Sequence, residues 1–264
     1  MSVLDLFSLE GEVALVTGGT HGLGMAVATA LAEAGATLVI NGHSADRLEK
    51  ALEIDRDKGI DAKGYLFDVT DERQVAESVA RIENEVGPVG ILVNNAGIIK
   101  RIPALEMTLP EWNDVIATDL TAPFLMSRAV AAGMIRRGRG KIVNMCSMMS
   151  EVGRNSVTAY AAAKGGLKML TKNLATEWAS HNIQVNGIGP GYFATEQTAP
   201  IRVDGHPFND FIIGRTPASR WGDPEDLGGT AVFLASRASD FVNGHILYVD
   251  GGILASLGRA ANEY

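Results

Sequence analysis

The sequence predicts a doubly wound α/β fold, in which a parallel sheet of about seven strands is covered by helices on both faces. Short apolar runs alternate with longer segments of helical period along most of the chain, and the runs are apolar at successive positions. Strands that are buried on both faces have this pattern, and alternation with helices indicates βαβ units. No Pro/Gly/Ser-rich linker or fixed repeat divides the chain, so we expect one domain over residues 1–264.

Each expected element follows from a local pattern. The predicted strands are the apolar runs 13–18, 36–42, 62–69, 91–97, 141–147, 183–191 and 245–252. The predicted helices, which have apolar residues at helical spacing, include 24–35, 71–87, 110–138 and 165–182. One region, residues 192–224, carries four of the nine prolines and has no clean period. Irregular inserts of this length are often lids, so we expect a substrate loop at about 192–224.

Composition excludes several classes of function. The net charge is −8 and no basic run exceeds RRGR at 136–139, which argues against a nucleic-acid or anionic-membrane partner. The single cysteine, Cys146, excludes an internal disulfide and fits a reducing cytosol. We find no charged leader followed by an apolar stretch and no run of about 18 apolar residues. We therefore expect a cytoplasmic protein, and the sequence assigns no metal ligand.

A glycine-rich turn follows the first predicted strand. The segment TGGTHGLG, residues 17–24, leads directly into a helix. Such a turn lets backbone approach a pyrophosphate, while the helix N-terminus offers free N–H groups and a partial positive charge. Gly18, Gly22 and Gly24 are the positions that we assign to this task. A tight turn without a ligand is the alternative for this motif alone, but a turn after the first strand of a parallel sheet favours a dinucleotide site.

The end of the second strand bears on the type of cofactor. An NAD-binding unit usually carries an acidic residue there, about 20 residues after the first glycine. In INGHSADR, residues 40–47, Gly42 and His43 occupy that place. Nothing negative would repel a 2′-phosphate, and His43, Ser44 and Arg47 offer groups to bind one. We therefore expect NADP(H) rather than NAD(H). The alternative is that these are ordinary surface residues after a strand.

The segment TAYAAAKGGLK, residues 158–168, places Tyr160 and Lys164 four residues apart. On a helix these two side chains share one face, and the alanines between them leave room for a close approach. A phenol is a weak base at neutral pH, and a cation one turn away favours its ionised form. The pair alone is common on ordinary helices, so its meaning depends on the motifs around it.

Five motifs in order resemble the classical short-chain dehydrogenase/reductase family over essentially the whole chain. They are TGGTHGLG, NNAG at 94–97, Ser147, the YAAAK segment and PGYFAT at 190–195. The resemblance implies an NAD(P)-dependent oxidoreductase that acts on CH–OH groups, with Ser147, Tyr160 and Lys164 as catalytic residues. Asp119 stands where the family often has an asparagine that relays protons. An ionised aspartate can hold a water but cannot donate to it, so the relay role of Asp119 stays open.

The same resemblance implies a cofactor site and a homotetramer. In the family, the Asp after the third strand touches adenine, and the threonine after PG contacts the nicotinamide carboxamide. With the two residues proposed at the end of the second strand, the expected cofactor-binding residues are Gly18, Thr20, His21, Gly22, Leu23, Gly24, His43, Ser44, Asp68, Val69, Asn95, Ala96, Gly97, Tyr160, Lys164, Pro190, Gly191 and Thr195.

Segments that flank the expected active site resemble those of gluconate 5-dehydrogenases and related sugar-acid enzymes. They are residues 95–108, 146–154, 190–198 and 206–227. A polyhydroxy carboxylate needs a cation and several polar groups. We expect Arg101 and Arg154 to bind its carboxylate, Glu151 to bind its hydroxyls, and Ser147 and Tyr160 to contact the reacting oxygen. Surface solvation is the alternative for both arginines.

Other functions remain open at this point. The same motifs fit a 2-deoxy-gluconate-type enzyme or a 3-oxoacyl-thioester reductase, although the latter would need a basic entrance for an acidic carrier protein. A different class is a regulator that binds the nicotinamide cofactor without catalysis. Such a regulator need not keep the three catalytic residues, which favours an enzyme.

Overall fold

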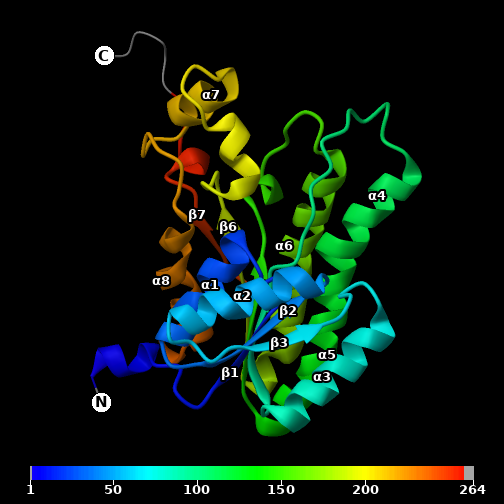
Figure 1. Ribbon diagram of the computed structural model, residues 1–264, viewed down its shortest axis with the longest axis vertical. Helices are drawn as coiled ribbons and strands as arrows, with labels where there is room; N and C mark the ends of the chain where they lie inside the picture. Colours follow the sequence, from blue (N-terminus) through cyan, green and yellow to red (C-terminus); the bar gives the residue numbers. More distant parts are fainter. Residues whose placement is uncertain (1, 259–264) are drawn as a thin grey trace.

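Seven parallel strands form one sheet in the order β3-β2-β1-β4-β5-β6-β7 (Figure 1). The computed structural model describes residues 2–258. Every predicted strand is present, which confirms the fold class. The strands are β1 (Val13–Val16), β2 (Thr37–Gly42), β3 (Lys63–Leu66), β4 (Val89–Asn94), β5 (Gly140–Met145), β6 (Ile183–Pro190) and β7 (Ile246–Val249).

Helices cover both faces of the sheet. Helices α1, α2 and α8 lie on one face of the sheet and α3, α5 and α6 on the other (Figure 1). The apolar side chains of each group form a core against the sheet. Two covered faces explain why the strands read as continuous apolar runs. The helices are α1 (Gly22–Glu33), α2 (Ala45–Asp57), α3 (Glu72–Glu85), α4 (Leu109–Ile116), α5 (Ala122–Arg137), α6 (Thr158–Trp178), α7 (Pro207–Arg215) and α8 (Gly228–Ala235).

Two helices differ from the sequence prediction in ways that affect the site. The segment predicted as helix 165–182 begins earlier, because α6 starts at Thr158 with a run of alanines that are strong helix formers. Tyr160 and Lys164 therefore lie on its first turns. The segment predicted as helix 110–138 consists of α4, a π-helical turn η2 (Ala117–Thr121) and α5. Such a turn inserts an extra residue, which changes the direction of nearby side chains.

The stretch Leu109–Arg137 also has the length and the apolar composition of a membrane-crossing helix, which the sequence reading did not anticipate. Half of its most apolar part is buried inside the fold. Val130 and Met134 of α5, for example, are fully buried in the core against the sheet. The apolar residues of this stretch thus serve core packing, as in buried helices of α/β proteins.

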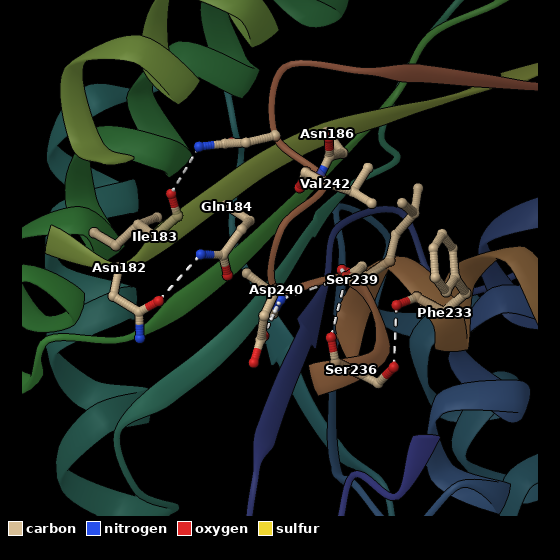
Figure 2. Close-up of polar contacts among 12 residues, drawn as sticks. Asn182, Ile183, Gln184, Asn186, Phe233, Ser236, Ser239, Asp240 and Val242 are labelled. Atoms are coloured by element: carbon tan, nitrogen blue, oxygen red, sulfur yellow. Dashed lines mark hydrogen bonds and ion pairs between the residues drawn. The ribbon is translucent and has the colours of Figure 1, made fainter. Parts of the chain in front are cut away.

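The loop before β7 is fixed to the sheet by polar side chains (Figure 2). The Asn186 amide on β6 donates to the Val242 carbonyl at 2.7 Å (Figure 2). Lys141 at the start of β5 donates to Asp240 at 2.7 Å. Burial lowers the pKa of Lys141, and the contact with Asp240 opposes this effect. These bonds hold the last strand beside β6, whose carboxyl end reaches the active site.

The predicted substrate loop, residues 192–224, is more regular than its sequence indicated. It contains a short helix η5 (Glu196–Ile201) and α7, which lies beyond the carboxyl ends of β6 and β7 (Figure 1). Aromatic contacts hold it together, since the Tyr192 ring lies 5.8 Å from both Phe208 and Trp221. Its action as a lid stays a prediction.

Candidate active site

A cavity of about 560 Å³ lies at the carboxyl ends of the strands. Its volume is within the usual range for small-molecule sites. It opens where the strand order reverses, because β1 pairs with β2 on one side and with β4 on the other. Ligands of doubly wound folds bind at this switch point. The five motifs of the sequence meet in the walls of this one cavity.

The turn after β1 has the geometry that a dinucleotide needs. Gly18 and Gly22 have φ angles of 61° and 55°, which favour glycine. A Cβ on Gly24 would lie 2.4 Å from the Gly18 carbonyl oxygen, so no larger residue fits there. Asn95 donates from its side-chain amide to the Thr17 and Gly18 carbonyls at 3.0 Å each. The turn is thus fixed with the N-terminus of α1 at the cavity, where a pyrophosphate would bind.

Thr17 holds this turn against the loop after β4, a role that the sequence reading did not assign. Its Oγ1 accepts from the backbone N–H groups of Asn95 and Ala96 at 3.0 and 3.1 Å. The same hydroxyl donates to the Val93 carbonyl at 3.3 Å. In the sequence, the one sign of this role is the position of Thr17 as the first residue of TGGTHGLG. Thr17 therefore sets the distance between the two walls of the cofactor site.

Two histidines and an arginine, His21, His43 and Arg47, lie near the end of β2. His21 and His43 both line the cavity, whereas the predicted Ser44 lies outside its lining and directly precedes α2. Burial and the nearby Arg47 lower the pKa of His21, against a weaker opposing effect of Glu196. Ser44 is thus not brought to the cavity wall, because the chain turns into the helix at this residue.

The remaining predicted cofactor residues lie where expected. Asp68, after β3, is oriented by Thr70, whose N–H and hydroxyl donate to its Oδ1 at 2.8 and 2.7 Å. The predicted cofactor-binding residues that line the cavity are Gly18, Thr20, His21, Gly22, Leu23, Gly24, His43, Asp68, Val69, Asn95, Ala96, Gly97, Tyr160, Lys164, Pro190, Gly191 and Thr195. Together with the tight glycine cradle, this lining fits an extended dinucleotide.

Ser147, Tyr160 and Lys164 lie in the wall of the same cavity. Ser147 Oγ accepts a hydrogen bond from the Met149 N–H at 3.1 Å, which leaves its own proton free for a ligand. Lys164 Nζ donates to the Met145 carbonyl at 2.9 Å and lies 5.4 Å from the centre of the Tyr160 ring. The lysine is thus fixed beside the tyrosine, as acid/base chemistry at a phenol requires.

Asp119 also reaches this wall, from the π-helical turn η2. It is fully buried, and its Oδ2 lies 3.1 Å from Lys164 Nζ. Burial opposes the charge on Lys164, but the Asp119 carboxylate and Tyr160 more than offset this, so the pKa of Lys164 lies above its ordinary value. The lysine is therefore held as a cation.

The three predicted substrate contacts divide into two groups. Arg101 and Arg154 line the cavity. Glu151 does not, because its carboxylate accepts hydrogen bonds from Lys168 and Tyr248, at 2.5 and 2.6 Å, away from the cavity. These two contacts lower the pKa of Glu151. Glu151 therefore lies outside the cavity lining, and its role toward substrate hydroxyls stays a prediction.

Other residues near the site have structural roles or were not assigned from sequence. Burial raises the pKa of the Cys146 thiol to about 11, so it stays protonated and is no nucleophile at neutral pH. Arg220 is paired with Asp226 at 2.6 Å. Lining residues without a role predicted from the sequence include Thr118, Ile98, Ile99, Met148, Met149, Tyr192, Phe193, Glu196 and Thr198. Their proximity depends on the folded loops.

The fold and this cavity define a nicotinamide-dependent oxidoreductase. The sequence comparisons agree, because residues 18–254 match the model of a family described as enoyl-(acyl carrier protein) reductase. The chain belongs to the short-chain dehydrogenase/reductase family.

Relatives within this family share most of the chain. It is 64% identical, over all of both chains, to 2-dehydro-3-deoxy-D-gluconate 5-dehydrogenase of Formosa agariphila. It is 51% identical to 5-keto-D-gluconate 5-reductase of Escherichia coli, over 96% of this chain and 99% of the relative. A crystal structure of a gluconate 5-dehydrogenase from Burkholderia cenocepacia, in complex with NADP and tartrate, matches with a TM-score of 0.92. That match has 44% identity and covers 97% of this chain and all of the other.

Proposed function

We propose that the protein interconverts D-gluconate and 5-keto-D-gluconate with NADP(H) as cofactor. The observation that carries this proposal is one cavity in which Ser147, Tyr160 and Lys164 lie together with two arginines. The relatives' names support carbon 5 as the reacting position, because both describe a reaction at carbon 5 of a gluconate-derived acid.

The residues of the cavity divide the chemistry between them. The nicotinamide ring, when bound, supplies or accepts the hydride. In oxidation, the Tyr160 phenolate takes the proton of the substrate hydroxyl, and the Lys164 cation stabilises that phenolate. In reduction, the Tyr160 phenol gives its proton to the carbonyl oxygen. Ser147 holds the substrate oxygen with its free hydroxyl proton, which is a positioning role.

Arg101 and Arg154 are the proposed partners of the substrate carboxylate. A guanidinium binds a carboxylate through two parallel hydrogen bonds, which fixes the orientation of the acid. Residues 192–224 are proposed to close over it, since Tyr192, Thr195 and Glu196 of this segment line the cavity. A closed loop would exclude water from the reacting atoms.

The preference for NADP(H) rests on the end of β2. Gly42 and His43 stand where a carboxylate would repel a 2′-phosphate, and Arg47 adds positive charge nearby, while His21 offers a ring nitrogen for a hydrogen bond. The Burkholderia relative was crystallised with NADP, which supports the same choice.

A second candidate substrate is 2-dehydro-3-deoxy-D-gluconate, because the relative with 64% identity carries that name. This acid differs from gluconate at carbons 2 and 3, so the same carboxylate and carbon 5 contacts could serve. A 3-oxoacyl-thioester substrate has less support, since the sugar-acid relatives match the chain from end to end. Binding without catalysis is also disfavoured, because the three catalytic residues meet in one cavity.

Initial rates with each acid and each cofactor test the proposal. We expect turnover of gluconate and 5-keto-D-gluconate, with kcat/KM at least about tenfold higher for the NADP pair than for the NAD pair. Faster turnover of 2-dehydro-3-deoxy-D-gluconate would select the second candidate. Turnover of an acyl-thioester ketone and of none of the three acids would overturn the proposal.

We also propose that the protein is a cytoplasmic homotetramer. Exposed apolar side chains at Phe124 on α5, Met169 on α6 and Phe241 before β7 favour burial against further copies of the chain. Light scattering should give a mass near four chains, and a monomeric mass would contradict the assembly.

A further inference from the structure

A buried carboxylate lies directly against the catalytic lysine. Asp119 is 0% exposed and Lys164 is 4% exposed. Asp119 Oδ1 accepts the Ile98 N–H at 2.8 Å, while Oδ2 lies 3.1 Å from Lys164 Nζ. The direction of this second contact is not that of a good hydrogen bond. The two groups therefore interact mainly through their charges.

The lysine cannot easily move away from this carboxylate. Its Nζ is also bound to the Met145 carbonyl at 2.9 Å, and Asp119 is fixed by the backbone of Ile98. The π-helical turn η2 directs Asp119 inward, and a Cβ on Gly97 would lie 2.9 Å from its Oδ2. Little space remains for either group to take another position.

Several other titratable groups lie around the pair. Cys146, directly after β5, is a neutral thiol at working pH, since burial raises its pKa to about 11. Arg101 and Arg154 line the same cavity from loops, and Glu196 lines it from η5, beside His21. Asp119 is the carboxylate that forms an ion pair with Lys164.

We propose that Asp119 is a positioning residue that acts through Lys164 and makes Tyr160 hold its proton more tightly. A negative charge 3.1 Å from the ammonium cancels part of the field that the ammonium exerts at the phenol. The Lys164–Tyr160 pair loses a proton as one coupled unit, and an adjacent carboxylate makes that loss harder whichever group gives it up. The site is thereby set to donate a proton at neutral pH, which serves ketone reduction. The statement about reduction rests on the proposed function.

The test is a pair of neutral variants, Asp119→Asn and Asp119→Ser. Asparagine keeps the shape and an oxygen for the Ile98 N–H but removes the charge. In the oxidation direction, the midpoint of the alkaline rise in kcat should move to lower pH by at least about one unit. Reduction at neutral pH should fall at the same time. A midpoint at the wild-type pH, or above it, in both variants would overturn the proposal.

The control is Asp114→Asn, which removes a carboxylate one helical turn away. Asp114 is paired with Lys100 on the surface, and its side chain is 60% exposed. Its variant should keep the wild-type midpoint. A shift equal to that of Asp119→Asn would show a general effect of net charge and would contradict the specific role.

A second measurement needs no substrate. The phenolate absorbance of Tyr160 is obtained as the difference between each protein and its Tyr160→Phe counterpart during a pH titration. The phenolate should form at lower pH in Asp119→Asn than in the wild type. This measurement also separates the role of Asp119 from the proposed substrate, because its result does not depend on whether gluconate is the substrate. Phenolate formation at the same pH in both proteins would overturn the role of Asp119 independently.

Discussion

The two arginines of the cavity differ in how firmly they are held. Arg154 donates to the Tyr192 hydroxyl at 3.2 Å, and its guanidinium lies 5.0 Å from the centre of the Phe208 ring. Arg101 is exposed and has no such partner among residues 2–258. A pre-ordered side chain loses less entropy when it binds a ligand. Arg154 should therefore contribute more to carboxylate binding.

Substitution of Arg154 by alanine should raise KM for gluconate about tenfold to a hundredfold, since a charge-assisted hydrogen bond contributes about 1.5–3 kcal/mol. Arg101→Ala should raise the KM for gluconate less. Neither variant should raise the KM for an uncharged alcohol to the same degree. Steady-state kinetics with both kinds of substrate measure this. Arg128, paired with Glu72 on the surface, offers a control whose alanine variant should leave KM unchanged. Equal effects on charged and uncharged substrates would refute the carboxylate assignment.

At the same scale, residues could be predicted from sequence where a motif fixes them. Tyr160 and Lys164 are tied by helical spacing, and the three glycines by the turn. The position of Glu151 outside the cavity lining could not be predicted, because its partners, Lys168 and Tyr248, come from α6 and β7 and are brought to it only by the fold. Proximity in sequence to Ser147 did not place it in the cavity.

At the scale of elements, the glycine-rich segment 17–24 spans the turn after β1 and the first turn of α1. Gly24→Ala should lower affinity for NADP(H) by at least about tenfold, because the added Cβ would clash with the Gly18 carbonyl at 2.4 Å. Gly229→Ala in α8 is the matched control, since a Cβ there meets nothing within 4 Å. It should keep the affinity and stabilise the protein by up to about 1 kcal/mol.

Fluorescence titration of NADPH with both variants measures this affinity. Unchanged affinity in Gly24→Ala would contradict the assignment of this turn to the pyrophosphate.

Regular elements were easier to predict than their interruptions. The seven apolar runs correspond to seven strands, and the inner ones, such as β4 and β5, are buried at every position, which leaves a plain pattern. The π-helical turn within 109–137 could not be predicted, since the same residues suit an unbroken helix and the extra residue is stabilised by tertiary packing. The burial of Asp119 therefore became visible only in the structure.

At the scale of the molecule, several carboxyl groups have a folded-state pKa below the ordinary value. Backbone hydrogen bonds are the main cause at Asp71 and Glu111. At Glu85, Glu151 and Asp226, the main cause is a side-chain hydrogen bond from an arginine or a lysine. Burial has the opposite effect on Asp55. The five groups with a lowered pKa are Asp71, Glu85, Glu111, Glu151 and Asp226.

A depressed pKa contributes stability that is present above the unfolded value and is lost as pH falls through the folded value. The urea midpoint at fixed protein concentration should therefore stay nearly constant from about pH 8 to about pH 6 and fall below about pH 4.5. The raised pKa of Asp55, taken alone, would make the urea midpoint rise as the pH falls. A midpoint that rises on acidification would show that buried groups of the Asp55 type dominate.

The fold as a whole was predictable because the order of strands and helices determines a parallel sheet, and such a sheet binds ligands at its switch point. The parallel sheet confirms the predicted fold, and five distant motifs meet in one cavity at its switch point. The choice among sugar acids was less predictable, since it depends on loops whose positions are set by tertiary contacts such as those of Tyr192.

Tyr160 is the proposed acid/base in the oxidation of gluconate by NADP. Tyr160→Phe removes only the hydroxyl, so turnover should fall by at least about a hundredfold, as expected when a general acid/base is lost. NADP(H) should still bind within about twofold of the wild-type affinity. Turnover at the wild-type rate in this variant, with the cofactor bound, would contradict the account.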